Sequence, residues 1–539
     1  MLKKLNAMIR KKEYLVIFIL VLVKMVLLMV ANINSGLDGD EVMHIDAGNH
    51  LAWGYMSFQP LVGVIAWVQN LFQINSVFVH HLFVHLAAIV IMIFCGATVI
   101  QLGGGWKAVL LALLCILAAP GYSVTHHIFT PLVFEQLFWI TGFYVLVRYC
   151  KKQKSKDMIC LAILLGLGFM SKVSILILVA GMGVAVLLYK RDLLAQRMFW
   201  VAVVVFLVII SPNVYWQSQH AFPSFQHITA LYSKTLVKLD FINNLKLLFL
   251  TTNPLAAVVW VAGLLVAPFV LVTKDVRMAM AAMLGSFLII LLFRGQFHYY
   301  FPVILTALCV GSVILEHYFG NRRMVLVSFS VLLLGSGIFL NLYSTPILPL
   351  DNYIVYMGLD KKEGEKGKQM FFTQQAIVDN KTANADDRIP INFEAYYTHN
   401  DWVNLTASVN EIYRHLPESK RRNCLIWTRC YTQAAGINLY GKKYHLPLAF
   451  SQHASYYDWI PEFDKETTII AVANAYTPAD SVGIGSFFAA SFENFTWEEA
   501  VFCPFARDKY NAYYMIYLGE GLKFNSEGLK QKYKDFIFE

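Results

Sequence analysis

Charged residues are scarce in this chain of 539 residues. They make up 15% of it, and hydrophobic residues make up 57%. Soluble globular proteins carry roughly a quarter charged residues, so the composition excludes an ordinary soluble enzyme, and it also excludes disorder. No internal repeat and no tract of low complexity is visible in the sequence. At this length two or more domains are expected.

Cysteine pairs of the kind that hold zinc are also missing. None of the eight cysteines forms a C-x-x-C motif, so a zinc ribbon is not predicted. Five of them lie in or beside apolar runs and are interpreted as small hydrophobic residues. Cys424, Cys430 and Cys503 lie in the polar C-terminal part, where an oxidising compartment would allow one disulfide and leave one thiol.

Long apolar runs account for the composition. A membrane-spanning helix needs about 20 mostly apolar residues. Eleven runs, several of them short, lie at 14–33, 77–100, 108–122, 128–147, 157–171, 173–189, 198–212, 253–273, 278–293, 299–316 and 324–342. The first follows five lysines and arginines and has no small-residue cleavage site, which predicts a retained anchor and not a signal peptide.

The basic residues predict the orientation in the membrane. With the N-terminus in the cytoplasm, cytoplasmic segments contain 18 of the 24 lysines and arginines before residue 343, and external loops contain five. This asymmetry follows the positive-inside rule, and it places residues 343–539 outside. The excess of basic residues is thus explained by topology, and no nucleic-acid partner is predicted.

The last third of the chain differs in character. It contains no spanning run, and its alternation of short segments predicts a small soluble α/β domain at 346–539. Strands are expected at 424–427, 468–473 and 513–518, and helices at 405–416, 433–440 and 484–490. Residues 1–345 are expected to form a transmembrane domain with a long first external loop at 34–76. The predicted fold is a polytopic α-helical membrane protein, with about 11 transmembrane helices and a C-terminal soluble α/β domain.

External acids are the first candidates for chemistry. Asp40 and Glu41 are adjacent in the 34–76 loop, where they would repel each other unless one is hydrogen-bonded or paired. A carboxylate at the membrane edge can act as a general base. The alternative is that these acids cap a helix that begins near Val42.

A third acid, Glu135, lies among apolar residues near the external end of the run at 128–147. An ionisable residue in such a place is a functional candidate. An ion pair with a histidine or lysine of a neighbouring helix explains it equally well. His126 and His127, close by, are interpreted as interfacial residues, and no metal site is predicted there.

Cations are rare in the external loops, so two of them are conspicuous. Lys172 interrupts a long apolar stretch, and Arg294 opens the segment R-G-Q-F-H-Y-Y-F-P, which includes His298. Cations at the membrane surface suit a phosphate that is anchored to a lipid. Each could instead be an interfacial anchor whose aliphatic stem lies along apolar surface.

Together these motifs resemble the bacterial branch of the dolichyl-phosphate-mannose–protein mannosyltransferase superfamily. Its members are glycosyltransferases of the GT-C fold, and the lipid A aminoarabinose transferases are relatives. The shared features are the D-E pair, G-Y-x-x-x-Q-P-L, V-F-E-Q-L-F-W, S-K-V-S, P-N-V-Y-W-Q-S-Q-H-A-F-P and R-G-Q-F-H-Y-Y-F-P-V-I-L, over roughly residues 30–345. Relatives often have P-P-L where Gln59-Pro60-Leu61 stands, lysine in place of Arg294 and an aromatic residue in place of His44.

The resemblance implies transfer of a sugar from a polyprenyl phosphate to a hydroxyl group of a protein, lipid or glycan, with inversion, on the outer face of the membrane. The residues that it implies fall into two groups. The catalytic acids are Asp40, the expected general base, with Glu41 and Glu135; the donor phosphate would be bound by Lys172, Arg294, His298 and Tyr299. Further candidates for substrate binding, apart from the resemblance, are His44, Gln59, His126 and His127.

The chemistry sets the expected cofactors and partners. A lipid phosphate leaves without a nucleotide-bound metal, so no cofactor is expected to be required; a divalent metal is possible but not predicted. The expected partners are a polyprenyl-phosphate-linked sugar, a hydroxyl acceptor and membrane lipids. The expected location is the bacterial inner membrane, with multiple passes, the N-terminus in the cytoplasm and the C-terminal domain in the periplasm.

Three other classes of protein remain as alternatives. A transporter is disfavoured because no inverted repeat and no paired broken helices are visible. A lipid-carrier-dependent glycan polymerase or ligase would use a similar external site but transfer a preassembled glycan. An inactive homologue that acts as an assembly subunit is disfavoured because Asp40 and Glu135 are both present.

Overall fold

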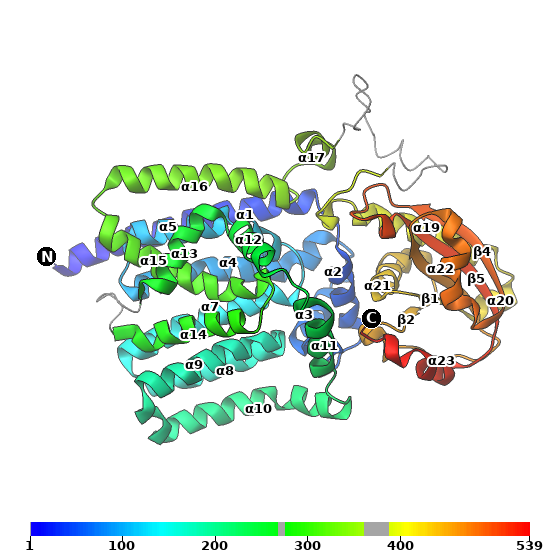
Figure 1. Cartoon of the computed structure of the whole chain (residues 1–539), viewed down its shortest axis with the longest axis horizontal. Helices are drawn as coiled ribbons and strands as arrows, with labels where there is room; N and C mark the ends of the chain where they lie inside the picture. Colours follow the sequence, from blue (N-terminus) through cyan, green and yellow to red (C-terminus); the bar gives the residue numbers. More distant parts are fainter. Residues whose placement is uncertain (1, 268–274, 360–387, 539) are drawn as a thin grey trace. The chain divides into compact units, whose positions relative to one another are not determined.

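The computed structural model describes residues 2–267, 275–359 and 388–538, with side chains from residue 11 (Figure 1). The chain divides into two compact units. Unit 1 comprises Met1–Val30, Ala52–Val62 and His81–Thr345, and unit 2 comprises Ala31–Leu51, Gly63–His80 and Pro346–Glu539. Much of the first external loop predicted at 34–76 therefore folds with the C-terminal residues. The assignment of residues 1–345 and 346–539 to two domains stays a prediction.

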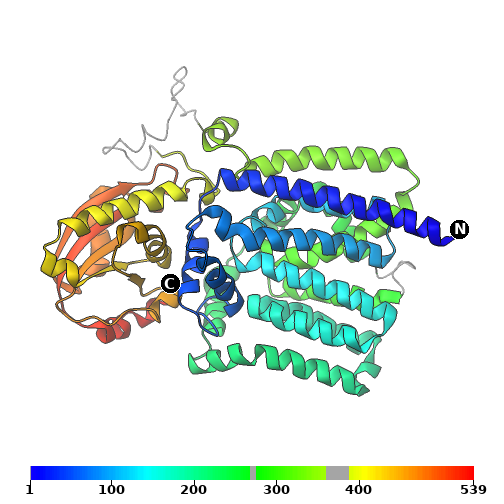
Figure 2. The same cartoon turned by 180° about the vertical axis from the view of Figure 1, so that it is seen from behind.

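Unit 1 is a helical bundle (Figures 1 and 2). Within the described residues, each of the eleven predicted apolar runs falls on one or two helices, so their helical character is confirmed. Proline opens several of these helices, as at Pro131 and Pro254, where its missing N–H costs nothing. The helices are α1 (Leu2–Ile33), α4 (Val77–Leu102), α5 (Trp106–Ala118), α6 (Pro120–Thr125), α7 (Pro131–Lys152), α8 (Ser155–Ser171), α9 (Leu176–Tyr189), α10 (Arg197–Gln219), α11 (Pro223–Leu231), α12 (Phe241–Thr251), α13 (Pro254–Leu265), α14 (Arg277–Leu292), α15 (Phe301–Phe319) and α16 (Arg323–Ser344).

Several of these helices suit a lipid bilayer. Among the described residues, five helical segments are long and apolar enough to cross a membrane, and the bent pair α12–α13 would make a sixth. Three further apolar helices are shorter: Trp106–Ala118, Val173–Tyr189 and Arg277–Leu292. The chain is thus a membrane protein with several apolar helices, and the number of eleven spans stays a prediction.

Glycines let helices of unit 1 pack closely. A Cβ atom on Gly263 of α13 would lie 2.0 Å from the carbonyl oxygen of Ala307 on α15. A Cβ atom on Gly311 of α15 would lie 1.9 Å from the carbonyl oxygen of Val259. The two helices therefore meet backbone to backbone at these glycines, as membrane helices do where small residues face each other.

Unit 2 contains a five-stranded sheet in the order β2-β1-β3-β5-β4. β1 is parallel to β2 and β3, whereas β5 is antiparallel to β3 and β4. The predicted strands are confirmed as β1, β3 and β5, and the predicted helices as α19, α21 and α22. The strands are β1 (Cys424–Thr428), β2 (Ala449–Ser451), β3 (Thr468–Ala475), β4 (Phe492–Phe502) and β5 (Tyr513–Leu522); the helices are α2 (Gly39–Asp46), most of α3 (Pro60–Asn70), α17 (Leu350–Tyr356), α19 (Thr398–His415), α20 (Glu418–Arg422), α21 (Tyr431–Tyr440), α22 (Ser481–Ala489) and α23 (Ser526–Tyr533).

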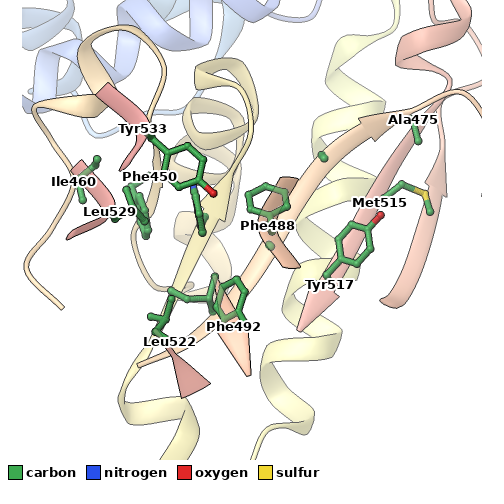
Figure 3. Close-up of a cluster of buried hydrophobic side chains, with 14 of the residues drawn as sticks. Phe450, Ile460, Ala475, Phe488, Phe492, Met515, Tyr517, Leu522, Leu529 and Tyr533 are labelled. Carbon is green, nitrogen blue, oxygen red and sulfur yellow. The ribbon is translucent and has the colours of Figure 1, made fainter. Parts of the chain in front are cut away.

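Aromatic rings fill the core of unit 2 (Figure 3). Trp427 of β1 is fully buried, and its ring lies 4.8 Å from that of Phe488 and 5.3 Å from that of Tyr533. Its indole N–H donates to Gln452 Oε1 at 2.9 Å, which satisfies the one polar atom of the ring.

The connections of the parallel strands create a switch point. From β1 the chain passes through α21 to β2 on one side, and it then returns to β3 on the other side of β1. Ligands of α/β proteins bind outside the carboxyl ends of strands at such a point.

Candidate functional site

The predicted acid pair lies in unit 2, at the start of α2. Asp38 is the N-cap, and its side chain accepts the backbone N–H of Asp40 at 2.8 Å. Glu41 Oε2 accepts the backbone N–H of Asp38 at 2.8 Å, which completes a capping box. Glu41 is fully buried. Helix capping, the alternative considered for this pair, therefore holds for Glu41.

Asp40 has a different environment from Glu41. Its side chain is exposed, and Oδ1 accepts a hydrogen bond from the hydroxyl of Tyr431 at 2.8 Å. Other carboxyl groups surround this position: burial, together with the charges of Asp40, Glu41 and Glu394, holds the pKa of Asp38 well above its usual range. Asp40 is thus the solvent-facing acid of a carboxyl-rich helix start.

The far end of α2 is held in place by contacts to the C-terminal residues. Asp46 is buried, and its Oδ2 accepts hydrogen bonds from Asn438 at 2.9 Å and from the hydroxyl of Tyr456. Because Tyr431 meets the start of α2 and Asn438 meets its end, α2 and α21 run parallel with their N-termini together. The contacts of Tyr431, Asn438 and Tyr456 with α2 could not be predicted from the sequence, since each residue lies more than 390 residues from its partner.

His44 and Gln59, two further candidates for substrate binding, belong to different units. His44 is buried in α2, with 5% of its surface exposed. Gln59 belongs to unit 1, where its side chain is 3% exposed and donates to Ser224 Oγ at 3.3 Å. Both candidates for substrate binding are thus packed side chains, and their role stays a prediction.

Glu135 and Lys172 meet in unit 1. Lys172 Nζ lies 3.1 Å from Glu135 Oε2, and Ser174 Oγ donates to Glu135 Oε1 at 2.5 Å. The Glu135 side chain is 2% exposed and that of Lys172 is 17% exposed. The ion pair considered for Glu135 therefore exists, and its partner is the lysine that was selected independently as a phosphate ligand.

His298 and Tyr299, in the segment after α14, lie beside the ion pair of Glu135 and Lys172. Lys172 Nζ lies 4.8 Å from the centre of the Tyr299 ring, and the His298 ring lies 4.5 Å from that of Tyr299. The structure thus brings together Glu135, Lys172, Ser174, His298 and Tyr299, which we call the Lys172 cluster. Ser174 was not predicted, although it follows Lys172 by two residues in the S-K-V-S motif.

Arg294 is exposed and shortly precedes His298 and Tyr299 of the cluster in sequence. Its backbone has a left-handed conformation, with φ of 52°. The carboxamide of Asn244, on α12, donates to the carbonyl of Gly295 at 3.0 Å and accepts the N–H of Phe297 at 2.8 Å. Asn244 therefore fixes the loop between Arg294 and His298, and no sequence pattern pointed to it.

The histidine pair before α7 is fully buried within the protein, and its expected location at the membrane interface stays a prediction. His126 Nε2 lies 2.9 Å from Gln136 Oε1. His127 lies beside His81 and His85, which are one helical turn apart on α4. Nitrogen atoms of these three histidines lie within 4.8 Å of one another, so they could hold a metal ion. The sequence did not predict such a group because His127 is distant from the other two.

The comparisons with known proteins agree with the resemblance in the sequence. Residues 60–216 match the profile of a family described as dolichyl-phosphate-mannose-protein mannosyltransferase. The crystal structure of ArnT from Cupriavidus metallidurans bound to undecaprenyl phosphate is similar, with a TM-score of 0.56 and 14% identity over 93% of this chain and 97% of that one. ArnT from the same organism in the apo state gives 0.53 and 15%, over 92% and 96%. No curated protein matches the chain.

Proposed function

We propose that the chain is a membrane glycosyltransferase of the GT-C type that transfers a sugar from a polyprenyl phosphate to a hydroxyl group on the outer face of the membrane. The undecaprenyl phosphate bound to ArnT supports the class of donor. The observation that carries the assignment of the base is the contrast within the acid pair. Glu41 is buried in a capping box, whereas Asp40 is exposed and oriented by a tyrosine hydroxyl.

The Lys172 cluster would act on the donor phosphate. A lysine ammonium has three N–H donors. The ammonium group of Lys172 contacts the carboxylate of Glu135 and the face of the Tyr299 ring, which fixes its position. It keeps N–H donor capacity for a phosphate oxygen. The exposed guanidinium of Arg294 adds a second cation. Fixed cations stabilise the negative charge that develops on a departing phosphate.

Asp40 would act on the acceptor. Its carboxylate removes the proton from the acceptor hydroxyl as that oxygen forms a bond to the anomeric carbon of the sugar. The bond from the anomeric carbon to the phosphate oxygen breaks at the same time, and its electron pair leaves with the lipid phosphate. Attack from the side opposite to the leaving group inverts the anomeric centre. Tyr431 would hold the carboxylate in position.

The location and the acceptor belong to the same proposal. The positive-inside pattern supports a cytoplasmic N-terminus and a periplasmic C-terminal domain in a bacterial inner membrane. Acceptors that fit the reaction are protein, lipid and glycan hydroxyl groups. No step requires a metal ion.

Turnover of defined donors tests the proposal. Purified protein in lipid nanodiscs is supplied with radiolabelled polyprenyl-phosphate sugars, and release of polyprenyl phosphate is measured with and without candidate acceptors. Because a general base contributes about 10²–10⁴-fold, Asp40→Asn is expected to lose at least about 100-fold in kcat. Asp535→Asn, an exposed acid elsewhere in unit 2, is the matched control and keeps wild-type turnover.

Three results would contradict this assignment. Full turnover by a folded Asp40→Asn protein would remove Asp40 as the base. Transfer of a preassembled glycan, seen in the product mass, would indicate the polymerase or ligase alternative. Solute flux across proteoliposomes without donor turnover would indicate a transporter.

A further inference from the structure

Unit 2 contains a cavity of about 460 Å³ at one edge of its sheet. Arg429 and Cys430 follow β1, Asn474 lies near the end of β3, and Tyr514 lies at the start of β5; all four line the cavity. The parallel strands end at this edge, and the antiparallel β5 begins there. The cavity therefore lies at the switch point of the sheet, where ligands bind in this type of fold.

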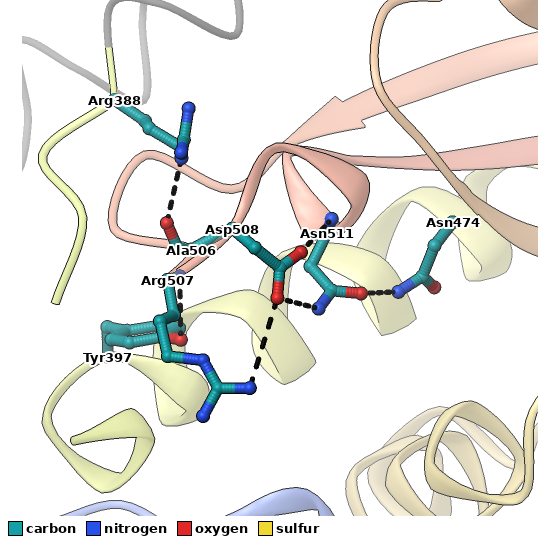
Figure 4. A network of polar contacts seen from close by, with 7 residues as sticks. All are labelled: Arg388, Tyr397, Asn474, Ala506, Arg507, Asp508 and Asn511. Carbon is teal, nitrogen blue, oxygen red and sulfur yellow. Dashed lines mark hydrogen bonds and ion pairs between the residues drawn. The ribbon is translucent and has the colours of Figure 1, made fainter. Parts of the chain in front are cut away.

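A chain of carboxamides forms one wall of the cavity. Gln433 donates to Asn474, and Asn474 donates to Asn511. Asn511 in turn donates to Asp508, from its side chain at 3.2 Å and from its backbone at 3.1 Å (Figure 4). Each carboxamide has two N–H donors and two lone pairs. The chain therefore fixes these groups and leaves donors and acceptors for a ligand.

Opposite charges balance in the rest of the lining. Glu394 and Asp401 come from the segment before and within α19, and Arg429 follows β1. Burial raises the pKa of Asp401 to about 8, so this carboxyl group is protonated at neutral pH and can donate a hydrogen bond. With Asp401 protonated, the lining contains one acidic charge, on Glu394, and one basic charge, on Arg429. The lining therefore suits a neutral ligand with many hydroxyl groups better than an anion or a cation.

Size and aromatic lining narrow the class of ligand. Pockets for small molecules measure about 300–1,000 Å³, and 460 Å³ has room for a mono- or disaccharide. Tyr397, Tyr510 and Tyr514 line the cavity and offer flat apolar faces beside hydroxyl groups. A sugar ring presents the same combination of an apolar face and hydroxyl groups.

The cavity also adjoins the acid that is proposed as the base. Gly39 lines it, and Asp40 is the next residue. Tyr431, which donates to Asp40, lies between Cys430 and Thr432, and both of these residues line the cavity. We propose that this cavity binds a sugar unit of the acceptor and directs one of its hydroxyl groups toward Asp40. The acceptor is then a glycan or a glycolipid; the role of Asp40 in this statement rests on the proposed function.

Binding of free saccharides by the full chain tests the proposal without any donor. The probes are methyl glycosides of hexoses, pentoses and N-acetylhexosamines and their disaccharides, measured by saturation-transfer NMR on protein in nanodiscs. We expect at least one probe to bind with Kd of about 1 mM or tighter. Asn511→Ala and Glu394→Gln are expected to weaken that affinity at least about tenfold, because each removes ligand-facing hydrogen-bond capacity. Asn494→Ala, an exposed asparagine on β4 outside the cavity, is the matched control and binds as wild type does.

The possible outcomes separate this proposal from the proposed function. Thermal unfolding first establishes that each variant is folded. If no saccharide binds, or if Asn511→Ala and Glu394→Gln both bind as wild type does, the cavity is not a saccharide site, whatever the donor assay shows. If saccharides bind as expected but no polyprenyl-phosphate sugar is turned over, the proposed transferase function fails and the saccharide site stands. Transfer to a peptide alone would also overturn the assignment of the acceptor.

Discussion

The ion pair between Glu135 and Lys172 predicts an asymmetric response to mutation. Glu135 is 2% exposed and its carboxylate contacts Lys172 Nζ at 3.1 Å and Ser174 Oγ at 2.5 Å. Removing one partner of a buried pair leaves an uncompensated charge, which costs about 3–5 kcal/mol. Lys172→Met should therefore destabilise unit 1 by this amount, because the Glu135 carboxylate has little access to water.

The reverse substitution should cost less. In Glu135→Gln the ammonium of Lys172 keeps contact with the Tyr299 ring at 4.8 Å and is 17% exposed, so part of its solvation remains. We expect a loss of about 1–3 kcal/mol, the range for an unsatisfied buried polar partner. The double variant Glu135→Gln/Lys172→Met carries no buried charge, and it should recover most of the stability that Lys172→Met loses.

Unfolding of the four proteins by SDS titration in mixed micelles measures this coupling as a double-mutant cycle. Donor turnover, measured in parallel, separates structure from catalysis. Glu135→Gln should keep the chemical step within about tenfold of wild type if Glu135 acts by positioning Lys172. A coupling energy below about 0.5 kcal/mol, or a loss of kcat in Glu135→Gln as large as that in Asp40→Asn without loss of stability, would refute the reasoning.

Three further expectations follow from the capping box, the buried carboxyl of unit 2 and the histidine group. Glu41→Ala should lose about 1 kcal/mol of stability and Glu41→Gln less, because glutamine also completes a capping box; equal stability of both variants would contradict the role of Glu41. The pKa of Asp401 is about 8 in the folded protein, above the ordinary aspartate value that it has in the unfolded chain. Between these two values the folded state binds one proton more than the unfolded state, so the free energy of unfolding should fall as pH rises from about 5 to 8. Unfolding curves of Asp401→Asn should lack this decrease, and an unchanged pH dependence would contradict the assignment. Metal chelation should leave donor turnover unchanged; loss of turnover that zinc restores would instead assign a bound metal to the group His81, His85 and His127.

Features encoded within a short window of the sequence were predictable. Apolar runs gave the helices of unit 1, since a helix that buries apolar surface is a local property of composition. The central strands β1, β3 and β5 were visible as short buried runs. β2 was missed because it has three residues, and β4 because six of its residues, from Glu493 to Glu498, are polar or only partly buried at the edge of the sheet.

Contacts between distant segments were not predictable. The Lys172 cluster joins α7, the end of α8 and the segment after α14, and each contributes an ionisable or aromatic residue that has an ordinary explanation alone. The sequence supplied the candidates Glu135, Lys172 and Tyr299, and only the fold showed that they contact one another. The grouping of residues 31–51 with the C-terminal unit likewise depends on pairs such as Asp46–Tyr456, for which no local pattern exists.

The acid pair shows how a local signal can be present and yet be assigned to the wrong residue. The prediction placed a helix start near Val42, with Asp40 and Glu41 both as possible caps. The segment D-G-D-E contains an acid at the N-cap, Asp38, and a glutamate three residues later, Glu41, which is the spacing of a capping box. In that register the first turn uses Asp38 and Glu41 to satisfy backbone N–H groups, and Asp40 lies between them with its side chain directed outward to Tyr431. The two adjacent acids therefore differ in function. Glu41 stabilises the start of α2 through the capping box, and this helix start in turn determines the position of Asp40.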